Sequence, residues 1–404
     1  MKMIRGFTAL LITLVFLSAC KPTTSEPIPL VDTPMNAEVQ STKIVTPEPE
    51  QTITPNIIST VTTQPTNTIA PVPSLNVSAS NQTGPLYDLS FSIPVGKGGV
   101  RYQGVGVERM EITGPNALAA LPDGRFIIAD PLDNRLLYYK PDGNFEKAID
   151  LFTLGIVNVS DLQVAANWLF VKEISFDISP TRYRVNKLSV EGELIASYDI
   201  PAEYRLADNL PGIIVDGDGR LLLDIEMVGI PPGFKYHLPS NVIQLVDSQG
   251  NWSPIATDGL RYNERIFHHY DATISGNQNA VIAGDIRVET ALTLGFGGLR
   301  ILGVLPDGRF FLTREDVVQD SPVIEVDQTV HFISFDGVQL GVARYPLSER
   351  LYYVERNITL GPDGCVYALL PREKSLDVLR LNLYNNLNPL IPGAAEPLVV
   401  KASQ

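Results

Sequence analysis

Five polar residues hold equivalent places in a repeated sequence pattern, and together they could bind a ligand. Each lies eight residues before a turn glycine, or near that level in a less regular copy of the repeat. These residues are Asn116, Asp161, Asp271, Arg300 and Arg356. Two arginines at one place suit a carboxylate or a phosphate group. The set therefore predicts a ligand-binding site at one end of the repeats.

Other interpretations of these residues compete with a binding site. The arginines could pair with nearby acids and merely line the site; the candidates are Glu315, Glu325, Glu349 and Glu355. His268 and His269 are adjacent, and adjacent side chains on a strand point to opposite faces, so they cannot easily chelate together. One of them could act as a general base with Asp271, which is the catalytic alternative.

The stretch from 115 to 151 shows which elements must position the candidate residues. Four short apolar runs alternate with three turn signals. Asp123-Gly124 and Asp142-Gly143 predict two-residue hairpin turns, in which both central residues have φ > 0. The product is an antiparallel meander of about 40 residues, the size of one propeller blade. One such sheet cannot bury its own faces, so it predicts similar neighbours.

Copies of this meander continue along the chain. The outer turn glycines are Gly143, Gly192, Gly250 and Gly337, at intervals of 49, 58 and 87 residues. The last interval equals two units of about 43 residues, so the count reaches six. The run from Leu86 to Pro94 precedes the first full unit and looks like an outer strand without a blade. We therefore predict an all-β, six-bladed propeller of four-stranded antiparallel blades over 86–404, closed by this N-terminal strand on the last blade.

An acid ends the second strand of each predicted unit. These acids are Asp130, Glu173, Asp224, Asp285, Glu315 or Asp316, and Glu373. A ring of carboxylates could bind a metal. We expect instead that each acid accepts backbone N–H bonds in the following turn.

The first unit resembles an NHL repeat through Asp123-Gly124-Arg125, Ala129-Asp130, Asn134-Arg135 and Pro141-Asp142-Gly143. The whole architecture resembles the wider six-bladed group that includes the gluconolactonase-like lactonases. That resemblance implies a calcium or other divalent site whose oxygen ligands come from several blades. Asn116, Asp161 and Asp271 would supply some of those ligands. A divalent-cation-dependent lactonase or hydrolase is therefore an alternative function, although fold similarity alone does not establish function.

The N-terminus predicts export and lipid attachment. Residues 1–20 contain a short basic start, an apolar run from Phe7 to Leu17 and the ending Leu17-Ser18-Ala19-Cys20. The run is too short to span a bilayer permanently and has the length of a signal peptide core. The ending resembles the bacterial lipobox, which implies that Cys20 is lipidated and anchors the protein to a membrane.

Residues 21–85 differ in composition from both flanking segments. Thr and Pro dominate, and no aromatic residue occurs between Phe16 and Tyr87. Such a segment cannot bury enough apolar surface to offset the entropy of ordering. We expect a disordered tether with a reach of about 45 Å.

The net charge of −14 argues against nucleic acid as a partner. We expect a membrane-anchored, extracytoplasmic binding or interaction module of the bacterial cell envelope rather than an enzyme. No cofactor is expected, with Ca²⁺ or another divalent cation as the alternative. The partner could be a protein, a peptide or a saccharide. Sugar or cell-wall binding would use the aromatic residues Tyr236, Tyr262 and Tyr270.

Overall fold

A computed structural model describes residues 78–404, with gaps at 109, 166, 176–181, 201–211, 227–240, 248, 255–259, 263–264, 273–277, 295–296, 321–322, 391–397 and 403–404. The chain divides into two compact units, residues 1–66 and 67–404, and every described residue belongs to the second. The predicted signal peptide, Cys20 and the tether up to residue 77 lie outside the described residues.

The fold is an all-β propeller of four-stranded antiparallel blades. The described strands form six sheets, which we number as blades 1 to 6 in chain order of their inner strands. From the inside outward, blade 1 contains β3 (Ala117–Ala120), β4 (Phe126–Asp130), β5 (Arg135–Tyr139) and β6 (Phe145–Asp150). Blade 2 contains β7 (Val159–Ala165), β8 (Trp168–Ser175), β9 (Arg182–Ser189) and β10 (Leu194–Asp199). Blade 3 contains β11 (Gly212–Val215), β12 (Leu221–Glu226), β13 (Asn241–Val246) and β14 (Trp252–Pro254).

Blades 4 and 5 carry additional strands, whereas blade 6 has four. Blade 4 contains β15 (Leu260–Tyr262), β16 (Arg265–Ala272), β17 (Gln278–Ala283), β18 (Ile286–Ala291) and the C-terminal β27 (Val399–Ala402). Blade 5 contains β19 (Gly297–Val304), β20 (Phe310–Gln319), β21 (Glu325–Ile333) and β22 (Gln339–Arg344), followed by β26 (Tyr384–Asn386) and β1 (Ser78–Asn81). Blade 6 contains β23 (Ile358–Leu360), β24 (Val366–Pro371), β25 (Ser375–Leu381) and β2 (Tyr87–Pro94).

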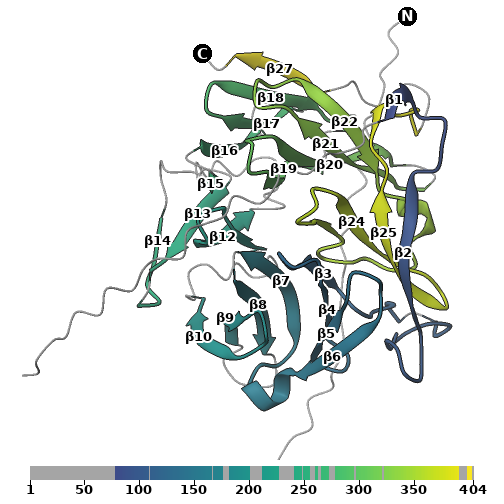
Figure 1. Ribbon diagram of the computed structural model, residues 1–404, viewed down its shortest axis with the longest axis vertical. Helices are drawn as coiled ribbons and strands as arrows, with labels where there is room; N and C mark the ends of the chain where they lie inside the picture. Colours follow the sequence, from purple (N-terminus) through teal and green to yellow (C-terminus); the bar gives the residue numbers. More distant parts are fainter. Residues whose placement is uncertain are drawn as a thin grey trace, which may run out of the picture. The chain divides into compact units, whose positions relative to one another are not determined.

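Several neighbouring blades contact one another through their inner strands (Figure 1). Strand β3 contacts β7, and β7 contacts β11. At the other end of the series, β19 contacts β23, and β23 contacts β3, so the last blade meets the first. The inner strands consequently bring residues that lie far apart in the sequence to a common centre.

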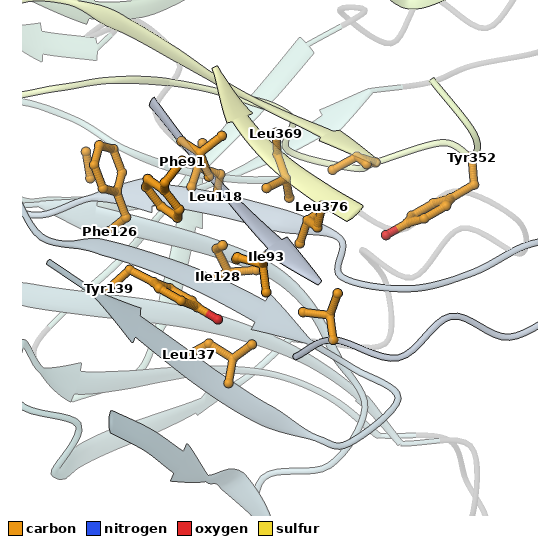
Figure 2. Close-up of a cluster of buried hydrophobic side chains, with 14 residues drawn as sticks. Phe91, Ile93, Leu118, Phe126, Ile128, Leu137, Tyr139, Tyr352, Leu369 and Leu376 are labelled. Carbon is orange, nitrogen blue, oxygen red and sulfur yellow. The ribbon is translucent and has the colours of Figure 1, made fainter. Parts of the chain in front are cut away.

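Strand β2 joins the N-terminal part of the propeller to its last blade. It pairs antiparallel with β25, as the run before the first unit predicted. Phe91 and Ile93 of β2 are buried in a cluster that includes Leu118 of blade 1 and Leu369 of blade 6 (Figure 2). The strand therefore completes blade 6 with backbone hydrogen bonds and also seals the junction with blade 1 with apolar packing.

The hairpin turns differ from the predicted two-residue type. At the first turn Leu121 N donates to Arg125 O over 2.8 Å, and Gly124 N donates to Leu121 O over 2.9 Å. Gly124 has a φ of 87°, whereas Asp123 is not among the described residues with positive φ. This is a three-residue loop in which a tight turn ends in a left-handed glycine. Pro122 favours this loop because its fixed φ suits the first turn position.

The predicted boundary between the tether and the propeller lies too late in the sequence. Its boundary was placed at residue 85, but residues 78–81 form β1, which pairs in parallel with β26. Gln82 N also donates to Asn386 O over 3.0 Å. The segment follows no blade pattern of its own, because it only adds to an existing edge.

The acids at the ends of the second strands form ion pairs with arginines more than they accept hydrogen bonds from backbone N–H groups of the following turn. Buried Asp130 accepts from Arg135 Nε over 2.9 Å, and buried Glu173 accepts from Arg182 and Arg184. Asp316 accepts from the backbone N and the hydroxyl of Thr293. The expectation of backbone donors was therefore wrong for the first two acids.

Helix is sparse, and within the described ranges the 3₁₀ segments with defined bounds are η1 (Leu151–Leu154) and η3 (Leu347–Glu349). Among those residues, no helix has the length and apolar content needed to cross a membrane.

Candidate functional site

Arg356 forms a two-pronged ion pair with Asp161 at the centre of the propeller. Arg356 Nε donates to Asp161 Oδ1 over 2.7 Å, and Nη2 donates to Oδ2 over 2.8 Å. The same Nη2 donates to Ile213 O over 3.0 Å. Arg356 lies just before blade 6, Asp161 lies in β7 of blade 2, and Ile213 lies in β11 of blade 3. One guanidinium therefore connects three blades.

The backbone of Arg356 fixes the direction of its side chain. Arg356 N donates to Asn116 O and Arg356 O accepts from Leu118 N, each over 3.0 Å. These bonds make a short parallel bridge between Arg356 and Ala117, immediately before β23. The side chain of Arg356 therefore extends from a backbone segment that hydrogen bonds to blade 1 hold in place.

The charges of the pair stabilise each other. The Asp161 side chain is 1% exposed and that of Arg356 is 27% exposed. Burial by itself would raise the pKa of Asp161, but the Arg356 guanidinium and the nearby Lys172 ammonium bring that pKa below its usual value of 3.8. Asp161 also accepts from Leu162 N over 2.7 Å. Asp161 is therefore ionised, and its two oxygens are already used.

Asn116 lies beside this pair and bonds to blade 2. Its Nδ2 donates to Ser160 O over 3.1 Å and to Val159 O over 3.3 Å. Its Oδ1 is buried and has no hydrogen-bond partner among the described residues. Asn116 thus joins blades 1 and 2 at the starts of their inner strands.

Arg300 brings a second positive charge to the same end of the propeller. Its side chain is exposed on β19 of blade 5, and it lies close enough to Arg356 for the two charges to interact. We call Asn116, Asp161, Arg300 and Arg356 the mouth residues. Asp271 lies on β16, but its side chain lies outside the described part of the structure.

The sequence analysis named the mouth residues as candidates but did not predict how they pair. Arg356 pairs with Asp161, not with one of the glutamates considered above. Arg372 is the residue that pairs with Glu349, over 2.7 Å. In the structure Asn116 and Arg356 lie just before their inner strands, and Arg300 lies within β19. The repeat offset carried no information on which of these residues contact one another across the centre.

The donor set does not fit the divalent cation implied by the lactonase resemblance. Such an ion needs several free oxygen ligands around one point. Both oxygens of Asp161 instead accept from Arg356, so among the described side chains of this set only Asn116 Oδ1 is a free oxygen. Across the described residues, no group of three or more His, Cys, Asp or Glu side chains could hold a metal.

Tyr353 is a site residue that the sequence analysis missed. It is 60% exposed and lies three residues before Arg356. Desolvation and the carboxylates of Glu355 and Glu315 raise its pKa to about 12, against the opposing charge of Arg300. An exposed aromatic residue outside the strand pattern would have been the signal, because loops near a strand start carry ligand contacts.

The three tyrosines considered for sugar binding do not form such a surface in the described part of the chain. Tyr262 packs edge-on against Phe267, with ring centroids 5.6 Å apart, and its hydroxyl donates to Val215 O over 3.4 Å. Tyr236 and the side chain of Tyr270 lie outside the described part.

Comparisons with known proteins give similarity in structure only. No family model matches the chain, and no curated protein matches it in sequence. A glucose dehydrogenase structure is 12% identical, with a TM-score of 0.43, and the match covers 74% of this chain and 99% of that one. Virginiamycin B lyase from Staphylococcus aureus is 12% identical, with a TM-score of 0.37, over 66% of this chain and 94% of the lyase. A structural-genomics target with a provisional gluconolactonase assignment is 15% identical, with a TM-score of 0.36, over 68% and 90%.

Proposed function

We propose that this protein is a lipid-anchored, extracytoplasmic propeller that binds an anionic ligand at the mouth residues. The observation that carries the proposal is the Asp161–Arg356 pair. It uses the carboxylate that a metal-dependent hydrolase would need, and it holds a guanidinium in a fixed orientation beside Arg300. Arginine donors suit carboxylate and phosphate groups.

Two features favour binding over hydrolysis. Asp161 is ionised and doubly hydrogen-bonded, so it is a poor proton acceptor and a poor metal ligand. Arg356 retains Nη1 as a donor for which no bond to a described residue is found. A bound anion would accept from this nitrogen and would also gain from the charge of Arg300.

The proposal includes the organisation of the whole chain. Residues 1–20 are the lipoprotein signal, Cys20 carries the acyl chains, and the following Thr- and Pro-rich segment holds the propeller away from a membrane of the cell envelope. The propeller has six NHL-like blades, which the repeat count and the six sheets support. The partner at the mouth residues is a ligand, with no nucleic acid involved.

Thermal unfolding of the full chain tests the binding site. Citrate and inorganic phosphate should raise the Tm in a concentration-dependent way, since a ligand that binds only the folded state stabilises it. Arg300→Gln should reduce that shift, whereas millimolar CaCl2 should leave the Tm unchanged. A calcium-dependent rise in Tm that Asp161→Asn abolishes would overturn the proposal in favour of a metal site.

Metabolic labelling with palmitate in a bacterial host tests the anchor. Cys20→Ala should abolish labelling, because the predicted thioether forms on that sulfur. Cys365→Ala is the matched control, since it removes the other cysteine of the chain, and it should leave labelling intact. Labelling that persists in the Cys20 variant would show that the N-terminus is not a lipobox.

A further inference from the structure

The inner edge of blade 3 carries backbone groups that its own sheet does not use. Strand β11 is the innermost strand of this blade and pairs with β12. Just beyond the strand, Asp216 N donates to Arg220 O over 3.2 Å. Because hydrogen-bonded pairs alternate along an antiparallel ladder, the N–H and C=O groups of Ile213 and Val215 point away from β12. Both residues are buried, so these groups need partners elsewhere.

Gln163 on β7 of blade 2 supplies partners for two of these groups. Its Nε2 donates to Ile213 O over 2.6 Å, and its Oε1 accepts from Val215 N over 2.8 Å. One side-chain amide thus bonds β11 as the backbone of a neighbouring strand would, with its donor and its acceptor on residues two apart. Gln163 therefore joins the inner strands of blades 2 and 3 and fixes the direction of the Ile213 carbonyl.

The carbonyl that Gln163 holds is also an acceptor for Arg356. Arg356 Nη2 donates to Ile213 O over 3.0 Å, while Nε and Nη2 donate to the two oxygens of Asp161. A guanidinium has five N–H protons. These bonds use the Nε proton and both Nη2 protons, so the remaining two belong to Nη1. Asp161 and Gln163 lie two residues apart on β7, so their side chains share one face of the strand.

We propose that Gln163 is a positioning residue of the anion site, which acts on Arg356 through Ile213 O. This inference rests on the proposed anion-binding function. By holding the carbonyl, Gln163 commits the second proton of Nη2 and leaves Nη1 as the nitrogen of Arg356 that a ligand reaches. Arg356 consequently cannot offer an anion the fork formed by Nη1 and Nη2 together, and its remaining donor keeps one orientation.

Calorimetric titration of the full chain with sulfate tests the role of Gln163. Gln163→Leu removes both bonds to β11 and leaves a side chain of similar reach. Arg356 then loses its fixed third acceptor, and sulfate should bind about tenfold more weakly, the effect of one hydrogen bond to a charged group.

Gln328→Leu is the matched control variant. The amide of Gln328 on β21 of blade 5 bonds the side chain of Asn357, which lies just before β23 of blade 6, over 2.8 and 3.4 Å. This variant therefore also loses an amide contact between two blades, but it leaves Ile213 O in place. It should lose stability as the Gln163 variant does and bind sulfate like the wild type. A tenfold loss in both variants would overturn the inference, because it would make the effect a general loss of contact between blades.

Gln163→Glu gives a pH-dependent test that a structural role would not produce. At pH 7 the carboxylate cannot donate to Ile213 O, so sulfate should bind more weakly than to the wild type. A protonated carboxyl group can donate to Ile213 O and accept from Val215 N, as the amide does. Asp161 stays ionised down to pH 4.5, since its pKa is below 3.8. The deficit relative to the wild type should therefore shrink from pH 7 to pH 4.5, and an equal deficit at both pH values would overturn the inference.

NMR of arginine-labelled protein follows the guanidinium of Arg356 without a ligand. Separate Nη1 and Nη2 signals in the wild type should merge in Gln163→Leu, because rotation of the group is no longer restrained. If the signals stay separate and sulfate binding is unchanged in that variant, anion binding stands and the inference about Gln163 is wrong. If sulfate, citrate and phosphate all fail to bind the wild type, the proposed function fails, and the inference fails with it.

Discussion

Arg356 spans the centre of the propeller to hold both carboxylate oxygens of Asp161, at 2.7 and 2.8 Å. The pair joins blade 6 to blade 2, which are not neighbours in the ring. Since Asp161 is almost completely buried, its charge depends on Arg356 for compensation. The ion pair therefore stabilises the contact between the two blades. It also determines which ligands the mouth residues can bind.

Removal of the guanidinium should destabilise the protein strongly. Arg356→Met leaves the carboxylate of Asp161 buried without its partner, which costs about 3–5 kcal/mol in the free energy of unfolding. Urea denaturation at pH 7 measures the loss. Adding Asp161→Asn to that variant should restore part of the stability, because the unpaired charge is then gone. Losses that simply add would show that the two residues do not interact.

The destabilisation caused by Arg356→Met should become smaller at acidic pH. In the wild type the folded-state pKa of Asp161 lies below its usual value of 3.8, so the contribution of the pair is present above about that pH and is lost as the pH falls through the folded pKa. Without Arg356, burial dominates and raises the pKa, so the folded variant binds a proton more readily than the unfolded chain. The difference in unfolding free energy between the two proteins should therefore shrink from pH 7 to pH 4. A constant difference would contradict this account.

Gly143 should tolerate a side chain less well than a glycine in an equivalent turn. Its φ is 81°, and a Cβ there would lie 2.3 Å from Cβ of Phe91 on the closing strand β2. Gly219 has a similar φ of 76°, but a Cβ there would meet nothing within 4 Å. Gly143→Ala and Gly219→Ala share the backbone strain of about 1 kcal/mol, and only the former also displaces β2.

The comparison of the two alanine variants isolates the closure of the ring. Thermal unfolding should give a clearly lower Tm for Gly143→Ala than for Gly219→Ala. Hydrogen exchange should show the extra loss of protection in β2 and β25, which pair with each other. Equal Tm values would mean that Phe91 can move away without cost, so the packing of β2 on blade 1 would not contribute to closure.

Two ion pairs in the outer parts of the propeller should contribute differently to stability, because one is buried and the other is about half exposed. Asp327 and Arg344 are buried and joined by two hydrogen bonds of 2.7 and 3.0 Å. Asp88 and Arg380 make a single 2.9 Å contact, and each side chain is about half exposed. Asp327→Asn should cost several kcal/mol, because it leaves Arg344 buried and unpaired, whereas Asp88→Asn should change little in solvent. Urea denaturation of the two variants makes the comparison, and similar losses would contradict it.

Much of the fold follows from the sequence because turns and alternation act locally. The Asp-Gly pairs marked the hairpins of blade 1, and the unpaired run of Leu86–Pro94 marked the closing strand, since an apolar strand without a partner must find an edge. The turn type was missed because Pro122 changes the geometry of the Asp-Gly pair. Strands β1, β26 and β27 were missed because each adds to an existing edge and needs no alternating pattern of its own.

The candidate site was only partly predictable for a related reason. The repeat offset gave Asn116, Arg300 and Arg356 equivalent places in the sequence, which is a local property; in the structure the first and last lie just before their inner strands and Arg300 lies within β19. The contact between Arg356 and Asp161 joins residues 195 positions apart in the sequence, and its selection depends on how the blades close. Tyr353 lies in a connecting segment where no repeat pattern operates, so only the fold shows that its ring is exposed and influenced by the charge of Arg300.

His331 should make the stability of the protein fall as the pH is lowered from 6.5 to 4. It is buried in blade 5, where Nδ1 bonds Gln339 Oε1 and Nε2 bonds the Thr329 hydroxyl, each over 2.9 Å. Because an amide oxygen can only accept, Nδ1 carries a proton. In the neutral ring, Nε2 then accepts from the Thr329 hydroxyl. Burial lowers the pKa of His331 from 6.5 to about 4.

The direction of this pH effect follows from the two pKa values. Between pH 6.5 and 4 the unfolded chain binds a proton on this histidine and the folded protein does not, so unfolding takes up one proton and stability declines by up to about 1.4 kcal/mol per pH unit. Below pH 4 both states are protonated and this contribution stops changing. NMR titration of the imidazole should give a midpoint near 4, and His331→Gln should remove one proton from the slope of stability against pH. A midpoint near 6.5 would show instead that the ring is open to solvent.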